Sequence, residues 1–376
     1  MTEAQLAALR ARINDLNLEM LELLSERGRL VESIRAAKEA NGEKLFDGER
    51  EQAMLDTLEE ANTGPFSNRT IRGLFKQIFK ASLSFMQEKK VEEMLVSRCG
   101  GRPDRHIDIK GFVVGRDPFY IAGPCAVESD EQVERVAAHL ATMGVPFIRG
   151  GAFKPRSSPY SFQGLGVEGL RMLRAAATRH GLRTVTEVTD TRTVGLVAEF
   201  ADVIQIGARN MFNYELLKEV GRAGRPVLLK RGFSATIDEF LQAAEYMMLT
   251  GCEDVILCER GIRTFSRRTR NTLDISVVPL LRKMSRLPVV VDPSHAAGRK
   301  DVLVDLTAAA FAAGANGVMI EVHPEPSQAR SDANQQLTLE EFETLVRDVG
   351  NLYTGRVPFL EAPQPASERK VGLPCV

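Results

Sequence analysis

Four residues in the last two thirds of the chain have side chains that transition metals prefer as ligands. They are one thiol, one imidazole and two carboxylates: Cys125, His295, Glu321 and Asp332. Mixed sulfur, nitrogen and oxygen donors suit a borderline divalent transition metal better than calcium or magnesium. No local spacing such as C-x-x-C brings any two of them together, and a lone buried cysteine is more simply explained as a small core residue. The sequence therefore predicts a metal site only if the fold makes the four residues neighbours.

A second set of residues is basic and gathers at the ends of apolar runs. It consists of Arg149, Lys154, Arg156, Arg209, Lys230, Arg231 and Arg260. The whole chain is nearly neutral, with 49 Lys and Arg, 50 Asp and Glu and a net charge of -1, which argues against a general role in binding nucleic acid or a membrane surface. Unshielded cations in one small volume would repel one another by about 1 kcal/mol or more per pair. A local cluster is therefore typical of a site for multiply charged anions, above all phosphate and carboxylate.

The elements that must position these residues are short β-rich apolar runs that alternate with helical stretches. The eight runs are PFYIAGP, VPFIRGGAF, LRTVTEVT, DVIQIGAR, RPVLLKRG, EDVILCERG, LPVVVDPSH and NGVMIEVHP. A helical stretch follows each of them, the last being LTLEEFETLVRDV. Near-continuous apolar strands separated by helices predict parallel strands covered on both faces. Eight such units in about 230 residues predict a (β/α)8 TIM barrel over residues 118–351, and the regular repeat without G-x-G-x-x-G argues against an open doubly wound sheet.

A barrel would bring the candidate residues together, because the C-terminal ends of all eight strands meet on one face. Cys125 follows the first strand, His295 follows the seventh, and Glu321 and Asp332 follow the eighth. The first, seventh and eighth strands are neighbours once the barrel closes. The basic residues lie at the ends of the second, fourth, fifth and sixth strands, so a metal site and an anion site are expected side by side.

The first 98 residues have a different pattern, which is helical throughout. Apolar residues at 9, 13, 16, 20 and 23 follow steps of three and four, which is one face of a long helix. The stretches ANGEKLFDGEREQ and NTGPFSN then separate a second helix, at about 47–60, from a third at about 68–97. We expect an all-α three-helix domain over residues 1–98. A linker over 99–117 joins it to the barrel, and its FVVG has the composition of one short strand.

The remaining features of the chain bear on its location. No apolar run approaches the roughly 18 residues that a membrane span needs, and the charged, periodic N-terminus is no secretory signal. Five cysteines at irregular spacings are no disulfide framework and fit a reducing cytoplasm. Residues 352–376 form a Pro-containing C-terminal tail.

Several long motifs of the predicted barrel resemble those of a known enzyme family. They are AGPCAVES, IRGGAFKPRSSPYSFQGLG, QIGARNMFN, LLKRG, ILCERG, VVVDPSHAAGR and IEVHPEPSQARSDANQQL. From about residue 117 to residue 349 the chain closely resembles the type I-beta DAHP synthases (3-deoxy-D-arabino-heptulosonate 7-phosphate synthases). Members of this family condense phosphoenolpyruvate with erythrose 4-phosphate on a divalent metal and release phosphate. The reaction opens the shikimate pathway of aromatic amino acid biosynthesis.

The resemblance implies a role for each candidate residue of the barrel. The implied metal ligands are Cys125, His295, Glu321 and Asp332. The residues implied to hold phosphoenolpyruvate are Arg149, Lys154, Arg209, Lys230 and Arg260, with the backbone of Ala208. Those implied to hold erythrose 4-phosphate are Lys154, Arg156, Ser157 and Ser158, with Asp292 toward its hydroxyls. The catalytic set would be Lys154, Cys125, His295 and Glu187, the last positioning or deprotonating a water that attacks carbon 2.

Two points of the barrel's chemistry stay open at this level. The metal is a divalent transition ion such as Mn, Fe, Co or Zn, and the donor set does not select among them. A sister phosphoenolpyruvate-condensing barrel that makes a different sugar acid is the alternative function. The four-donor metal set and the KPRSS motif argue against that alternative, and a substrate test decides.

The first predicted helix carries basic residues that could bind one anion jointly with the same helix of a second chain. Arg27 interrupts the apolar seam, where a basic residue is costly to bury without a partner, although its stem could also snorkel to the surface. Lys38 lies 11 residues after Arg27, roughly 16 Å along the axis, and Arg10 lies 17 residues before it, roughly 25 Å away. One small dianion cannot reach both Arg10 and Arg27 of a straight helix. A dimer of antiparallel helices would bring the partner's Arg10 to Arg27.

The helical region also resembles a family, the all-helical chorismate mutases, which are intertwined dimers. The resemblance runs from about residue 2 to residue 90. The chorismate-binding positions that it implies are Arg10 from the partner, Arg27, Lys38, Asp47, Arg50, Glu51 and Ser82. The chain departs from the family at Met86, where Gln or Glu commonly touches the ether oxygen of the substrate.

The helical domain therefore has two interpretations. It is either a working mutase that isomerises chorismate to prephenate, or a regulatory module that binds these compounds and restrains the barrel. Both need the arginines, and only the first needs the polar group that Met86 replaces. We expect a DAHP synthase whose mutase-type domain binds prephenate or chorismate and is at most a weak mutase, with a fully active bifunctional enzyme as the alternative. The expected assembly is a homo-oligomer, a dimer through the helical domain and a tetramer overall.

Overall fold

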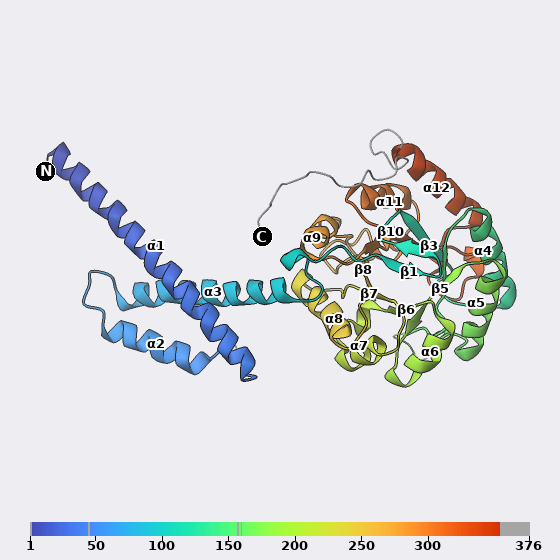
Figure 1. Cartoon of the computed structure of the whole chain (residues 1–376). Helices are drawn as coiled ribbons and strands as arrows, with labels where there is room; N and C mark the ends of the chain where they lie inside the picture. The colour runs from blue at the N-terminus through green and yellow to red at the C-terminus, as the bar shows by residue number, and fades with distance from the viewer. Residues whose placement is uncertain (1, 44–45, 156–157, 159, 354–376) are drawn as a thin grey trace. The chain divides into compact units, whose positions relative to one another are not determined.

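Figure 1 shows the computed structural model, which describes residues 2–43, 46–155, 158 and 160–353. The chain divides into two compact units that meet between Glu93 and Met94. No helix in this described part of the chain is long and apolar enough to cross a membrane. Nearly all of the expected C-terminal tail, from residue 354 onward, lies outside the described residues.

The boundary between the units is set by hydrogen bonds to the barrel. The backbone N–H groups of Leu95 and Val96 donate to the carboxylate of Glu245, at 2.8 and 3.0 Å. The Arg98 N–H donates to the Met284 carbonyl at 3.0 Å. Residues 94–98, which the sequence pattern assigned to the third helix and the helical domain, thus bond to the barrel unit instead.

The helical unit consists of three helices: α1 (Glu3–Ala40), α2 (Gly48–Glu60) and α3 (Asn68–Glu93). The Thr2 hydroxyl caps α1 by accepting from the Gln5 N–H, and the Asp47 carboxylate caps α2 by accepting from the Arg50 N–H. The buried Arg35 of α1 bonds Glu39 on its own helix and Glu93 on α3, at 2.7 and 2.6 Å. The prediction of three helices is confirmed.

The barrel unit is a closed ring of eight parallel strands with helices outside it (Figure 1). The strands, in the order of the chain and of the ring, are β3 (Phe119–Gly123), β4 (Phe147–Arg149), β5 (Arg183–Val188), β6 (Val203–Ile206), β7 (Val227–Lys230), β8 (Val255–Glu259), β9 (Val289–Val291) and β10 (Gly317–Glu321). The ring closes where β10 pairs with β3, from Gly317 beside Phe119 to Glu321 beside Gly123. The predicted (β/α)8 barrel is confirmed.

One or more helices follow each strand. The long ones are α4 (Asp130–Thr142), α5 (Val167–Arg179), α6 (Val194–Phe200), α7 (Tyr214–Gly221), α8 (Ile237–Leu249), α9 (Val277–Met284), α11 (Leu303–Ala312) and α12 (Leu339–Tyr353). The short ones are α10 (Pro293–Ala297) and the 3-10 turns η2 (Thr191–Thr193), η3 (Ala208–Asn210), η4 (Pro326–Gln328) and η5 (Ala333–Gln335). A further 3-10 turn, η1 (Cys99–Gly101), precedes all the strands. Because helices cover the outside and side chains fill the inside, the strands are buried almost throughout and read as continuous apolar runs.

A β-hairpin packs against the interior of the barrel at the starts of its strands. It consists of β1 (Ile107–Ile109) and β2 (Phe112–Val114), paired antiparallel. The Phe112 ring lies edge-on to Phe119 and Phe147, which lie at or near the starts of β3 and β4, with ring centroids 5.5 and 5.3 Å apart. FVVG thus forms the expected short strand. Its partner strand was not predicted, because Ile-Asp-Ile is too short to show a pattern.

Candidate metal and anion site

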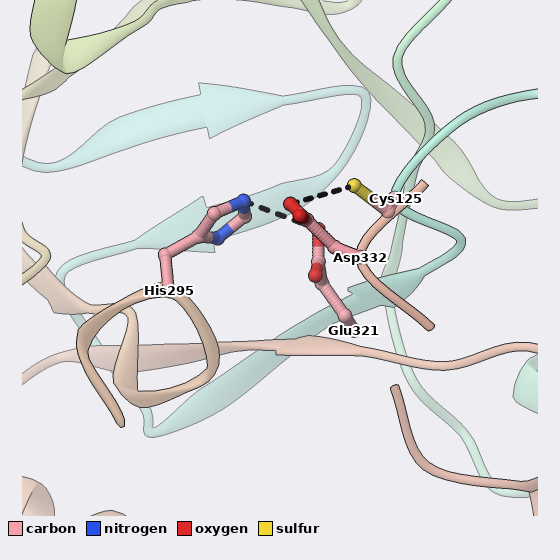
Figure 2. Close-up of side chains that lie close together, drawn as sticks. All are labelled: Cys125, His295, Glu321 and Asp332. Carbon is pink, nitrogen blue, oxygen red and sulfur yellow. Dashed lines mark hydrogen bonds and ion pairs between the residues drawn. The ribbon is translucent and has the colours of Figure 1, made fainter. Parts of the chain in front are cut away.

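The structure brings the four candidate metal ligands together at the C-terminal face of the barrel. One ligand atom from each of Cys125, His295, Glu321 and Asp332 lies within 4.8 Å of the other three (Figure 2). Cys125 follows β3, His295 lies on α10 just after β9, Glu321 ends β10, and Asp332 precedes η5. The Cys125 thiol is 3.4 Å from Asp332 Oδ2, and His295 Nε2 is 3.2 Å from Glu321 Oε1.

Two unusual backbone positions support this geometry. Gly123, at the end of β3, has φ +146°, and a Cβ there would lie 2.1 Å from the Arg149 carbonyl oxygen of β4. Only glycine therefore lets β3 end this close to β4 and deliver the loop that carries Cys125. Asp332 adopts the left-handed conformation, with φ 49° and ψ 38°, which short polar residues tolerate best among non-glycine residues.

His295 is oriented by a buried carboxylate. Asp292 accepts from the His295 backbone N–H at 2.9 Å and bonds the ring Nδ1 at 2.7 Å, which leaves Nε2 facing the other three ligands. The ammonium group of Lys230 donates to the same Asp292 oxygen at 2.5 Å. These three contacts engage both oxygens of Asp292, which is completely buried. Its predicted contact with erythrose hydroxyls stays a prediction, and this placement favours a role behind His295.

The charges of the four residues fit a divalent cation. Burial opposes the charge on Glu321, but His295, Arg149 and Lys154 outweigh it and lower the pKa of Glu321 to about 2. The pKa of Asp332 is also lowered, against the effect of burial. Burial lowers the pKa of His295 and leaves its ring neutral. Burial and the charge of Glu321 raise the pKa of the Cys125 thiol to about 12. Two carboxylates, a neutral imidazole and a thiol that a bound metal ion would help to ionise are suitable ligands for a transition metal.

Cationic side chains lie directly against these ligands. Arg149 Nη1 donates to Glu321 Oε1 at 2.5 Å, and both residues are buried. The Lys154 ammonium group is 3.2 Å from the Cys125 sulfur and 3.1 Å from its carbonyl oxygen. Two of the basic residues predicted to bind an anion therefore contact the candidate metal ligands directly. Arg149 and Lys230 each have a buried carboxylate partner, which offsets the repulsion between these two cations and the rest of the cluster.

A different arrangement holds three further arginines. The guanidinium groups of Arg209, Arg260 and Arg263 lie 5.6, 4.7 and 5.7 Å from the centre of the Phe233 ring. None of these arginines forms an ion pair with a carboxylate among the described residues. Arg260 is buried, and its guanidinium group donates to the carbonyl oxygens of Gly261 and His295. An aromatic ring attracts cations without neutralising them, so these guanidinium groups keep their capacity for an anion.

Arg231, next to Lys230 in sequence, belongs to the structural core instead. Its Nη1 bonds the buried Glu259 at 3.0 Å and Asp274 at 2.9 Å. Arg231 is therefore a salt-bridged residue of the protein core and not a cation available to an anionic substrate. Sequence reasoning missed Phe233 and Arg270, whose Nη1 is 3.4 Å from the ligand Asp332. The arginine-rich stretch RTFSRRTR was the available signal for Arg270.

The remaining predicted barrel residues lie around this face. Glu187 lies on β5, and its carboxylate lies beside Gly207, the residue that follows β6. Glycine leaves room for this carboxylate, since a Cβ at Gly207 would lie 2.1 Å from Glu187 Oε1. Ala208 begins η3. The exposed Ser158 hydroxyl accepts from the Tyr160 N–H at 3.3 Å. Arg156 and Ser157 lie outside the described residues.

In the helical unit the structure joins two of the predicted anion-binding positions. Arg27 of α1 donates to the Ser82 hydroxyl of α3, and its guanidinium group lies 5.2 Å from the centre of the Phe79 ring. Arg27 is thus the half-buried, partnered arginine of the apolar seam, and burial lowers its pKa. Lys38 and Met86 are also half-buried, and Arg10 is exposed on α1. Asp47, Arg50 and Glu51 lie at the start of α2, the first as its cap.

Comparison with known proteins assigns the barrel. Residues 104–354, two thirds of the chain, match the DAHP synthetase I family. The chain belongs to this family. Residues 9–87 match the family described as chorismate mutase type II, so this DAHP synthase family member carries a mutase-type helical domain.

The chain is similar to named proteins of two kinds. Phospho-2-dehydro-3-deoxyheptonate aldolase of Thermotoga maritima is 52% identical over 259 residues, which cover 69% of this chain and 77% of the relative. The crystal structure of DAHP synthase from Thermotoga maritima superposes with a TM-score of 0.68 at 51% identity, covering 70% of this chain and 77% of that one. A 2-dehydro-3-deoxyphosphooctonate aldolase of Acidithiobacillus ferrooxidans is 33% identical over 63% of this chain and 90% of its own.

Proposed function

We propose that the barrel condenses phosphoenolpyruvate with erythrose 4-phosphate, on a divalent transition metal, to give DAHP and phosphate. The observation that carries the proposal is the direct contact between anion-binding cations and metal ligands. Lys154 lies 3.2 Å from the Cys125 sulfur, and Arg149 lies 2.5 Å from Glu321. A metal in the four-donor cluster would therefore share one small volume with an anionic substrate.

The ligand set for the metal is Cys125, His295, Glu321 and Asp332, and a cation held there supplies Lewis-acid polarisation of the aldehyde oxygen. Lys154 and Arg149, on the side of β3 and β4, would bind the carboxylate or phosphate of phosphoenolpyruvate. Arg209 and Arg260, held on Phe233 without carboxylate partners, would bind its phosphate and stabilise that charge through to departure.

The bond-forming step joins carbon 3 of phosphoenolpyruvate to the aldehyde carbon. Positive charge develops at carbon 2, where a water adds, and the carbon–oxygen bond to phosphate then breaks. Glu187 is the carboxylate we assign to positioning or deprotonating that water. Arg156, Ser157 and Ser158 would hold the phosphate of erythrose 4-phosphate, with Lys154 between the two substrates.

The names of the relatives define the test between the two candidate reactions. A heptonate has seven carbons, three from phosphoenolpyruvate and four from the sugar, whereas an octonate needs a five-carbon sugar phosphate. Release of phosphate from phosphoenolpyruvate should require erythrose 4-phosphate and a divalent metal, and should cease with a chelator. Faster turnover with a five-carbon aldose phosphate would instead assign the sister reaction. The higher identity to the heptonate enzyme, 52% against 33%, supports the first outcome.

We infer that the helical unit binds chorismate or prephenate and regulates the barrel by feedback. The match to chorismate mutase type II and the contact of Arg27 with Ser82 support a carboxylate-binding site there. Met86 offers no hydrogen-bond donor, so the unit would be a poor mutase. The match to a mutase family equally supports the alternative of a fully active bifunctional enzyme, and the rate of chorismate isomerisation decides between them.

We also infer that the helical unit forms a dimer, and the full chain a tetramer. Residues 7–26 of α1 are all exposed in the single chain. They include the predicted apolar seam, with Leu9 55%, Ile13 57% and Leu23 65% exposed. An apolar stripe of this length on a long helix needs a covering partner. A second copy of α1 would cover it and would supply the partner's Arg10.

A further inference from the structure

Two consecutive glutamines lie buried behind the metal ligands. Gln335 is 3% exposed and Gln336 is fully buried, although glutamine is usually a surface residue. Buried amides need partners for both their N–H and C=O groups. The partners found here lie on, or next to, the candidate ligands.

Gln335 holds the carboxylate of Glu321. Its Nε2 donates a short hydrogen bond to Glu321 Oε2, the oxygen that is not bonded to Arg149. Its Oε1 accepts from Arg270 Nη1 at 3.3 Å. An amide can otherwise present either end, and the arginine donor fixes the oxygen toward itself, so the N–H end must face Glu321.

Gln336 holds the backbone beside two other ligands. Its Oε1 accepts from the Cys125 backbone N–H at 3.0 Å, and its Nε2 donates to the Ser331 carbonyl oxygen at 2.9 Å. Ser331 immediately precedes Asp332. One amide thus ties the loop after β3 to the loop after β10, at the points where the thiol and the second carboxylate leave the backbone.

The local backbone explains why two neighbours can face different ligands. Gln336 is extended, with φ -78° and ψ 134°, and in extended backbone successive side chains point to opposite sides. The segment is anchored beside the end of β10, since the Leu337 N–H donates to the Glu321 carbonyl and the His323 N–H donates to the Leu337 carbonyl, both at 2.9 Å.

We propose that Gln335 and Gln336 are positioning residues of the metal centre, fixing the Glu321 carboxylate and the Cys125 backbone in ligand geometry. The inference rests on the proposed metal site and extends it to residues that do not bind the ion. Removing an outer partner of a metal ligand typically weakens metal binding about 10–100-fold.

The test uses the full-length protein, stripped of metal and titrated with Co²⁺. Cobalt bound by a thiolate gives a sulfur-to-metal charge-transfer absorption, which reports the Cys125 bond independently of activity. The variants are Gln335→Met and Gln336→Met, which keep the length of the side chain and remove the amide. The matched control is Gln328→Met, in the same loop, because Gln328 is exposed and its amide donates to Glu325, which is not a candidate ligand.

We expect Gln335→Met to weaken Co²⁺ binding by about 10–100-fold while keeping the thiolate absorption. We expect Gln336→Met to weaken both the binding and that absorption, and the control to match the wild type. Wild-type affinity and absorption in both folded variants would overturn the inference. If Gln336→Met does not fold, Gln335→Met decides alone, and wild-type Co²⁺ affinity in that folded variant would overturn the inference. Absence of Co²⁺ binding by the wild type would instead refute the metal site itself.

Discussion

The metal affinity of the barrel site should rise with pH, and one thiol should account for the slope. The pKa of the Cys125 thiol is raised to about 12 from an ordinary 9.0. At pH 7 roughly one such thiol in 10⁵ is ionised, and the raised pKa makes ionisation about 4 kcal/mol costlier than for an ordinary thiol. A metal needs the thiolate. Binding must therefore release one proton.

The other ligands should contribute nothing to that slope above pH 7. Glu321, with its pKa of about 2, and Asp332, with its lowered pKa, are already ionised. The lowered pKa of His295 means that its ring is already neutral. The dissociation constant should then fall about tenfold per pH unit, or about a hundredfold between pH 7 and pH 9.

Calorimetric titration of the metal-free protein with Mn²⁺ or Zn²⁺, in buffers of different protonation enthalpy, measures both the affinity and the protons released. In Cys125→Ser the hydroxyl stays protonated, so the affinity should fall and its pH dependence should disappear. A pH-independent affinity in the wild type would mean that the thiol is already ionised without metal. Release of two protons would mean that His295 starts protonated. Either result would refute the reasoning.

Three further predictions follow from the same structure. Lys230→Met should lower the free energy of unfolding of the metal-free protein by about 3–5 kcal/mol in urea titrations, because it leaves the buried Asp292 without its cation. Arg260→Met breaks no ion pair among the described residues and should change the free energy of unfolding little. Equal losses in the two variants would contradict this account. Met86→Gln should raise the chorismate mutase rate by about a hundredfold or more with little change in prephenate affinity, since a donor at the ether oxygen acts mainly in the transition state; a fast wild-type mutase would show that another group supplies the donor. Removal of residues 1–93, leaving 94–98 bonded to the barrel, should abolish inhibition of phosphate release by prephenate and reduce the oligomer seen by analytical ultracentrifugation, and undiminished inhibition would place the sensor in the barrel.

The sequence alone determined the elements of this protein and the kinds of chemistry available to it. Eight apolar runs with intervening helical stretches have one economical arrangement, the closed barrel, because parallel strands buried on both faces need helices outside. Local signals also set the three N-terminal helices, since the spacing of apolar residues and the breaks at ANGEKLFDGEREQ and NTGPFSN separate them. Residue types at strand ends identified all four candidate metal ligands, since the barrel sends every strand end to one face.

Only the tertiary structure decided which charged residues pair with each other. Arg231 and Arg260 each follow a strand and look alike in sequence. Arg231 bonds the buried Glu259, whereas Arg260 lies on the Phe233 ring and has no carboxylate partner among the residues that the structure describes. Ion pairing depends on which side chains meet across the barrel, and these are separated by tens of residues along the chain. For the same reason the contacts of Asp292 could not be predicted. Its partner His295 is three residues away, but its other partner, Lys230, comes from β7.

The contacts of the two glutamines behind the ligands likewise could not be predicted from the sequence. Gln335 and Gln336 belong to a motif that identified the family, but nothing in their type or spacing predicts that one faces Glu321 and the other faces the Cys125 backbone, 211 residues away. Sequence sets which hydrogen-bonding groups a segment has. Closure of β10 on β3, by which the two ends of the barrel meet, determines what those groups can reach.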